Sequence, residues 1–323
     1  MSRPDNLDRP IEEQASHLPS PQSSVSSDHV IRFLGDRVRA HNIYERSTLT
    51  GPAALNPGLE NHLSFSSAQT PDQHRPIESS RSSLILVTPS TLESLGPESR
   101  SGLVAVDNPR REFARLVQHF FAEEVGGGVS PQAVIDPTAQ IGVNSRVDPG
   151  AYIGPDVVVG IGCRIGANVT LLPGTVIGNH TSIGPNTTVG HVGFGYARED
   201  DGSPVLIPHS GGVSIGSHVD IGANTCVDRG TLDDTVIEDH VKIDNLVHIA
   251  HNCRVEEGAF IIATAVLCGG VRVGPRTWIA PNASVREQLR VGADAVVGLG
   301  STVIRDVPDG ATVVGSPARQ VES

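Results

Sequence analysis

The chain has 323 residues, enough for two domains, and a formal net charge of −12. This acidic balance argues against a nucleic-acid surface, because neutralising phosphates requires a basic field. No stretch is long and apolar enough for a membrane span, and the N-terminal residues lack the apolar segment of a signal peptide. The four cysteines include no C-x-x-C pair, which fits reduced thiols better than a disulfide framework. We therefore expect a cytoplasmic protein.

The N-terminal third predicts a polar tail followed by a small folded domain. Residues 1–28 are rich in Ser, Pro, Asp and Glu, so we expect them to be disordered. Within residues 29–128, β-like runs at 83–87 and 102–106 alternate with turn signals. Apolar residues at helical spacing then predict a helix over 109–121. This pattern is typical of a small α+β domain.

A six-residue repeat dominates the rest of the chain, after a glycine run that predicts a linker or a turn. From Ile135 to Val189 every sixth residue is aliphatic, and the same count continues from Ile215 to Val303. Neither an α-helix nor an ordinary strand has this period. A hexapeptide period indicates a parallel β-solenoid, in which one inward aliphatic residue per hexad fills a triangular prism. About 25 hexads predict about eight coils stacked at about 4.8 Å, over residues 129–315.

Three segments depart from the repeat. Residues 191–212 break the hexad and predict an ejected loop, which reaches a ligand or a neighbouring subunit or is a tolerated insertion. A four-residue slip falls between Arg229 and Thr235. Residues 316–323 are expected to form a C-terminal turn.

One histidine in the coil is a candidate catalytic base. Because Ile249 points inward, His251 falls near a corner of the prism, and Gly269 follows eighteen residues later, one coil higher. A glycine stacked over an imidazole leaves an open space and an accessible N–H, which suits attack on a thioester carbonyl beside a base. Asp244 could orient the imidazole. The same spacing is also compatible with a surface histidine that has no catalytic role.

Three arginines are separated by eighteen residues each, which predicts a vertical column on one face of the coil. They are Arg254, Arg272 and Arg290. Like charges about 4.8 Å apart repel, so the column favours a bridging phosphate or an acidic partner, although solvation alone could stabilise it. A phosphopantetheine donor that lies along the column toward His251 would explain both features.

Several motifs resemble the UDP-3-O-acylglucosamine N-acyltransferase family of lipid A synthesis. They include Gly193-Phe194-Gly195-Tyr196-Ala197, Val227-Asp228-Arg229-Gly230-Thr231, Asp244-Asn245 and Ile249-Ala250-His251-Asn252. The resemblance implies a mainly β fold, a left-handed parallel β-helix preceded by a nucleotide-binding-like α+β domain. It also implies a homotrimer that moves an acyl group from a phosphopantetheine thioester to the amine of a nucleotide-linked sugar. The donor is acyl carrier protein or a coenzyme A thioester, with no bound cofactor and no metal.

The resemblance assigns roles to individual residues. His251 is the general base, Asp244 its partner and the Gly269 N–H the oxyanion donor, while Phe65 stacks on uracil. Gln288 stands where the family has a second active-site histidine. The complete set of substrate-binding candidates is Phe65, Phe194, Tyr196, Asp233, Asn245, His248 and Gln288. For Asp233, a structural role in a turn is an equal alternative.

Other functions stay open at this point. One is a short-chain acyl-CoA-dependent nucleotide-sugar acyltransferase with an acceptor outside lipid A synthesis. Another is a zinc lyase, which needs three histidines at subunit edges, whereas His248 and His251 have no obvious third ligand. The last is a non-catalytic scaffold or sugar-binding solenoid.

Overall fold

The computed structural model describes residues 24–43, 46–68, 70–96, 99–122 and 126–321. The chain divides into two compact units at residues 124 and 125, close to the expected boundary at 128. Each unit is described by itself. None of the described helices is long and apolar enough to cross a membrane.

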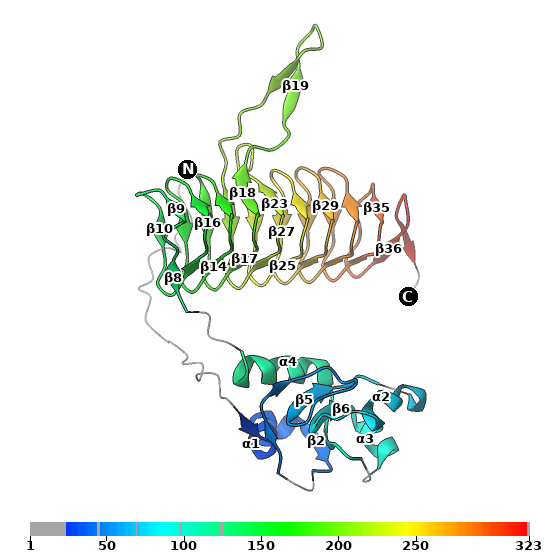
Figure 1. The fold of residues 1–323 in the computed structure, drawn as a ribbon. Helices are drawn as coiled ribbons and strands as arrows, with labels where there is room; N and C mark the ends of the chain where they lie inside the picture. Colours follow the sequence, from blue (N-terminus) through cyan, green and yellow to red (C-terminus); the bar gives the residue numbers. More distant parts are fainter. Residues whose placement is uncertain (1–23, 44–45, 69, 97–98, 123–125, 322–323) are drawn as a thin grey trace. The chain divides into compact units, whose positions relative to one another are not determined.

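The N-terminal unit is an α+β domain built on one five-stranded sheet (Figure 1). Its strands, in spatial order, are β2 (Val38–His41), β7 (Gly102–Val106), β6 (Leu84–Val87), β5 (His62–Phe65) and β4 (Gly51–Pro52). Only the edge strand β2 runs antiparallel to its neighbour. The helical segments are α1 (Ser27–Leu34), η1 (Gly35–Arg37), η2 (Pro71–Gln73), α2 (Arg75–Glu78), α3 (Pro89–Leu95) and α4 (Pro109–Phe120). The predicted strands and helix are thus confirmed.

The expected disordered tail is wrong in its last residues. Strand β1 (Val25–Ser26) pairs with β3 (Thr48–Leu49), and Val25 is buried. Helix α1 begins at Ser27 because the Ser26 side chain accepts the His29 N–H and caps it. The polar composition of the segment concealed this cap. The first 23 residues of the predicted tail lie outside the described part of the chain.

The C-terminal unit is a three-sided parallel coil, as the hexapeptide period predicts (Figure 1). One face contains β10 (Gln140–Ile141), β13 (Val158–Val159), β16 (Thr175–Ile177), β21 (Val213–Ile215), β24 (Thr235–Ile237), β27 (Arg254–Val255), β30 (Arg272–Val273) and β33 (Arg290–Val291). The second contains β9 (Val134–Ile135), β12 (Tyr152–Ile153), β15 (Thr170–Leu171), β18 (Thr188–His191), β23 (Cys226–Asp228), β26 (His248–Ile249), β29 (Val266–Leu267), β32 (Ser284–Val285) and β35 (Thr302–Val303).

The third face of the coil includes both ends of this unit. It contains β8 (Gly128–Val129), β11 (Arg146–Val147), β14 (Arg164–Ile165), β17 (Ser182–Ile183), β22 (Asp220–Ile221), β25 (Lys242–Ile243), β28 (Phe260–Ile261), β31 (Trp278–Ile279), β34 (Val296–Val297), β36 (Thr312–Val314) and β37 (Arg319–Val321). Strand β37 is antiparallel to β36, so the predicted C-terminal turn is the end of a β-hairpin. The last residue of the expected linker, Gly128, already belongs to the first strand of the coil.

Parallel pairing sets which residues share a column. Partners are eighteen residues apart in regular coils, as for Ile261 and Ile279, but 22 apart across the four-residue slip, as for Val227 and Ile249. From Val147 to Val303, the aliphatic residue at every sixth position of the coil strands is buried in one continuous core, while its neighbour in the strand faces outward.

The expected loop is a protruding hairpin (Figure 1). Strands β19 (Tyr196–Arg198) and β20 (Pro204–Leu206) pair antiparallel, and the coil resumes at β21. The hairpin presents Phe194 to solvent with 86% of its surface exposed. An exposed aromatic side chain of this size is available to contact a ligand or another chain.

Three histidines stack at one corner of the coil. The ring centroids of His180 and His218 are 5.2 Å apart, and those of His218 and His240 are 5.0 Å apart. Loss of hydration and the two neighbouring rings lower the pKa of His218 below its usual 6.5. The unfolded chain therefore takes up a proton at this residue more readily than the folded chain does.

We expect the melting temperature of the coil to fall as the pH is lowered from 7.5 through 6.5 to 5.5, because protonation favours the unfolded state. His218→Asn should reduce this fall, since asparagine tolerates the φ of 57° at this position. Calorimetry of both proteins at three pH values tests this. An equal fall in both would show that the histidine stack does not govern the pH dependence.

Candidate active site

A pocket of about 460 Å³ opens on the coil where the second face ends. Successive coils contribute Asp228, then His248 and His251, then Cys268 and Gly269, and finally Glu287 and Gln288. Phe194 joins them from the base of the hairpin. The ejected loop and four coils therefore share one concave, partly apolar site, the form that small-molecule sites usually take.

The predicted stacking of Gly269 on His251 is present. A Cβ atom at Gly269 would lie 2.7 Å from both Nε2 and Cε1 of the His251 ring. On the loop side, a Cβ at Gly193 would lie 2.8 Å from Cβ and 2.9 Å from Cδ2 of the same residue. Any side chain at either glycine would push the imidazole aside, so the two backbones set its position.

The hydrogen bonds around His251 determine which of its nitrogens carries the proton in the neutral ring. The Thr231 N–H donates to Asn252 Oδ1 at 3.1 Å, so this amide oxygen is fixed as an acceptor. His251 Nδ1 lies 2.9 Å from the same oxygen and must therefore donate to it. In the neutral ring Nε2 is then unprotonated, and this atom is the one beside Gly269.

The Gly269 N–H is available to a ligand. At some turns on the other two corners of the coil, a side chain of the next coil accepts the corresponding N–H: Asn179 accepts that of Ile161 at 2.9 Å, and Asn245 that of Ala223 at 2.7 Å. Among the described residues, nothing accepts the Gly269 N–H. A free backbone donor beside a base can stabilise a developing oxyanion.

Asp228 is the buried carboxylate of the pocket, and the sequence analysis gave it no role. It is 6% exposed, and its Oδ2 lies 3.7 Å from His248 Nε2. Burial raises its pKa, and nearby histidines, among them His248 and His191, oppose the shift. The sequence did contain a signal for the proximity of Asp228 to His248. If the four-residue slip is added to the period of eighteen, β23 lies directly beneath β26.

The expected pairing of Asp244 with His251 is not present. Asp244 follows β25 on the third face, and its carboxylate accepts the N–H groups of Asn245 (2.7 Å) and Ala263 (3.2 Å). His251 follows β26 on the next face. One hexad of the chain, from Ile243 to Ile249, separates the two faces. Asp244 and Asn245 therefore stabilise the turn after β25, whereas His251 belongs to the turn after β26. Asn252 and Thr231 contact His251 instead.

Only some of the other predicted binding residues line the pocket. Phe194, His248 and Gln288 line the pocket. Tyr196 does not line it, although its ring lies 5.0 Å from that of Phe194. The exposed Asp233 contributes through its backbone, since its carbonyl accepts the Asn252 Nδ2 hydrogen at 3.3 Å.

The arginine column has the predicted register. Arg254 pairs with Arg272, and Arg272 pairs with Arg290, on the face that follows the His251 corner. Arg254 forms an ion pair with Glu238, and Arg290 lies 3.5 Å from Asp309. These carboxylates offset part of the repulsion along the column. Binding of a donor phosphate here stays a prediction.

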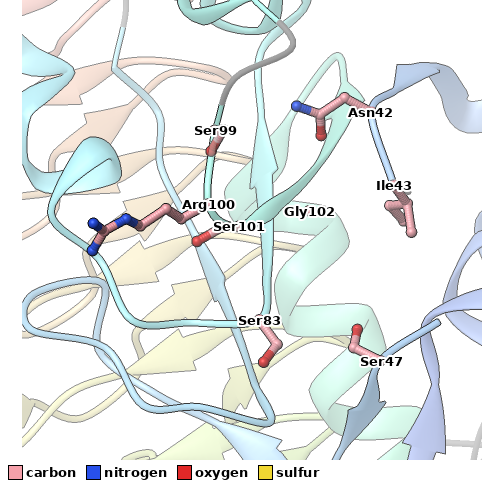
Figure 2. Close-up of a pocket in the computed structure, with 8 residues that line it drawn as sticks. All are labelled: Asn42, Ile43, Ser47, Ser83, Ser99, Arg100, Ser101 and Gly102. Atoms are coloured by element: carbon pink, nitrogen blue, oxygen red, sulfur yellow. The ribbon is translucent and has the colours of Figure 1, made fainter. Parts of the chain in front are cut away.

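Phe65 lies in the N-terminal unit, at the end of β5. Its ring packs against Phe113 of α4, with centroids 4.8 Å apart. A separate polar cavity of about 340 Å³ in the same unit is formed by Asn42, Ile43, Ser47, Ser83, Ser99, Arg100, Ser101 and Gly102 (Figure 2). Phe65 does not line it. Its stacking on uracil stays a prediction.

Comparison with known proteins agrees with the coil. The family described as "Bacterial transferase hexapeptide (six repeats)" matches residues 156–191. A UDP-N-acetylglucosamine acyltransferase (LpxA) from Bacteroides fragilis superposes with a TM-score of 0.55 at 25% identity, over 60% of this chain and 74% of that one. The corresponding enzyme from Campylobacter jejuni, at 23% identity and a TM-score of 0.55, supports the fold alone. The left-handed parallel β-helix is thus confirmed.

Curated relatives extend the similarity to most of the chain. UDP-3-O-acylglucosamine N-acyltransferase 2 of Legionella pneumophila (strain Lens) is 50% identical over 27% of this chain, a match that spans only 25% of its own length. UDP-3-O-acylglucosamine N-acyltransferase of Delftia acidovorans is 40% identical over 266 residues, which are 81% of this chain and 78% of the relative. The Bordetella parapertussis protein of the same name is 37% identical over 80% of this chain and 78% of its own. The chain therefore belongs to the UDP-3-O-acylglucosamine N-acyltransferase family.

Proposed function

We propose that this protein transfers an acyl group from a phosphopantetheine thioester to the amine of a UDP-linked amino sugar, as a step of lipid A synthesis. The observation that carries the proposal is the position of His251 Nε2, the nitrogen without a proton in the neutral ring, beside a free backbone N–H in a pocket. The names of relatives that match most of the chain support the substrate class.

The geometry supports a general-base mechanism. His251 Nε2 takes a proton from the sugar amine as the nitrogen attacks the thioester carbon. The carbonyl oxygen becomes an oxyanion that the Gly269 N–H stabilises. The C–S bond then breaks, and the imidazolium returns its proton to the departing thiolate. No step requires a metal.

The donor and the assembly are further parts of the proposal. We take the donor to be acyl carrier protein or coenzyme A, with its phosphates along Arg254, Arg272 and Arg290; the register of this column supports the placement. We also propose a homotrimer, in which each pocket is completed by a neighbouring chain. The exposed Phe194 of the hairpin supports a subunit contact near the pocket. The cytoplasmic setting stays a prediction.

Replacing His251 with alanine should lower kcat by about a hundredfold to ten-thousandfold, because the reaction loses its general base. The assay is release of thiol with mass spectrometry of the product, from a panel of UDP-amino sugars offered with long and short acyl thioesters. His180→Asn, in a histidine at another corner, is the matched control and should retain activity. Unchanged turnover in His251→Ala, with the oligomer intact, would refute the assignment.

Removing the Asn252 side chain should lower kcat with little change in KM, because the tautomer of His251 is no longer fixed. Asn252→Gly suits the φ of 61° at this position, and the loss should lie between about tenfold and the roughly 10⁴-fold cost of a wrong tautomer in a serine-protease triad. Nitrogen NMR of His251 should show a mixture of tautomers.

Two further variants separate this positioning role from a general effect on folding. Asn282→Gly changes an equivalent turn residue with a φ of 59° and should leave kcat intact. Asn252→Asp keeps the acceptor oxygen and should restore a single tautomer. A single unchanged tautomer in Asn252→Gly would show that the amide does not determine the state of the ring.

A further inference from the structure

Three metal-ligating side chains meet at the edge of the pocket. Cys226 Sγ, a carboxylate oxygen of Asp228 and a ring nitrogen of His248 all lie within 4.8 Å of one another. A thiolate, a carboxylate and an imidazole together are the donor set of borderline-soft divalent cations such as Zn²⁺. The family resemblance implied no metal, and a zinc lyase was disfavoured because His248 and His251 have no obvious third ligand in the sequence.

The fold brings these donors together through strand register. Cys226 and Asp228 lie on either side of the inward Val227, so both side chains point out of the same face of the coil. His248 is the direct partner of Cys226 one coil higher. Two ligands therefore come from one strand and the third from the strand paired with it.

The three donors of the cluster come from these two coils, and His191, the residue paired with Asp228 one coil lower, is not among them. The residue paired with Cys226 one coil lower is Thr188, and the residue paired with His248 one coil higher is Val266. Regular stacking of the repeat therefore does not place metal ligands along this column. An ion pair between Asp228 and His248 alone would not need a thiol beside it.

The spacing suits a metal after a small adjustment. Tetrahedral ligands with zinc bond lengths of about 2.0–2.3 Å lie roughly 3.3–3.8 Å apart. Asp228 Oδ2 and His248 Nε2 are already 3.7 Å apart. The His248 side chain is 42% exposed, so it can turn toward the thiol without disturbing the core.

We propose that Cys226, Asp228 and His248 form a binding site for a divalent zinc-like cation at the edge of the acyl-transfer pocket. Three protein ligands leave one coordination position open. Because Asp228 and His248 both line the pocket, that position faces the substrate space. On binding, the Cys226 S–H bond is replaced by a sulfur–metal bond, and one proton per ion passes to the solvent.

Titration of the purified full-length protein with Co²⁺ tests the site. A bound thiolate gives a sulfur-to-cobalt charge-transfer absorption, which we expect at one cobalt per chain and which Zn²⁺ should abolish by displacement. Cys226→Thr should lose this absorption, and threonine suits the position because Thr188 occupies it one coil lower. Asp228→Asn and His248→Gln should each weaken cobalt binding at least tenfold.

Cys268→Ser is the matched control, since this half-buried thiol lines the same pocket but is not part of the cluster. It should bind cobalt as the unmodified protein does. Absence of the thiolate–cobalt absorption would overturn the proposal. So would an absorption that persists in Cys226→Thr or disappears in Cys268→Ser.

A second measurement rests on the proposed function. Saturating Zn²⁺ should slow acyl transfer at least tenfold in the unmodified protein, because the ion occupies the substrate space. In Cys226→Thr the ratio of rates with and without Zn²⁺ should be close to one. Equal slowing in both proteins would place the inhibitory ion elsewhere. If no acyl transfer is detected at all, the proposed function fails, while the cobalt titration still decides the metal site.

Discussion

The structure depends on burial of one aliphatic side chain at every sixth position, combined with parallel pairing of each strand to the strand one coil away. Ile261 shows both, because it is fully buried and lies in register with Ile279. This burial stabilises the prism, and the pairing satisfies the backbone of every inner strand. Since each coil contacts only its neighbours, an insertion at one corner leaves the coils above and below unchanged. The hairpin and the four-residue slip are both insertions of this kind.

The candidate active site arises from such departures from regularity. The hairpin places Gly193 on one side of His251, and the slip supplies Thr231, which fixes the acceptor oxygen that orients the ring. Gly269 comes from the regular repeat, where its lack of a side chain admits the imidazole. The repeat thus provides a rigid frame, and two irregular segments make one of its corners chemically distinct. The same slip brings the thiol of Cys226 beneath His248.

Sequence periodicity was sufficient to predict whatever the eighteen-residue register determines. The three faces, the arginine column and the contact between His251 and Gly269 all follow from counting residues. The periodicity could not predict the hydrogen-bond partner of His251. Thr231 lies within the irregular slip, and its contact with Asn252 is not set by the repeat. Asp244 was misassigned because closeness along the sequence was taken for closeness in space, although a corner intervenes. At the other end of the chain, polar composition concealed the start of α1, which depends on one serine cap and one buried valine.

The two glycines that flank the His251 ring lie far apart in the sequence, and the second of them is made late in synthesis. His251 is held from one side by a residue made 58 positions earlier and from the other by a residue made 18 positions later. A nascent chain that ends before Gly269 lacks both the glycine that packs on the His251 ring and the free N–H. The growing coil thus acquires a complete candidate site at this corner only when the next coil has been added, so the order in which the coils are made sets when the site can form.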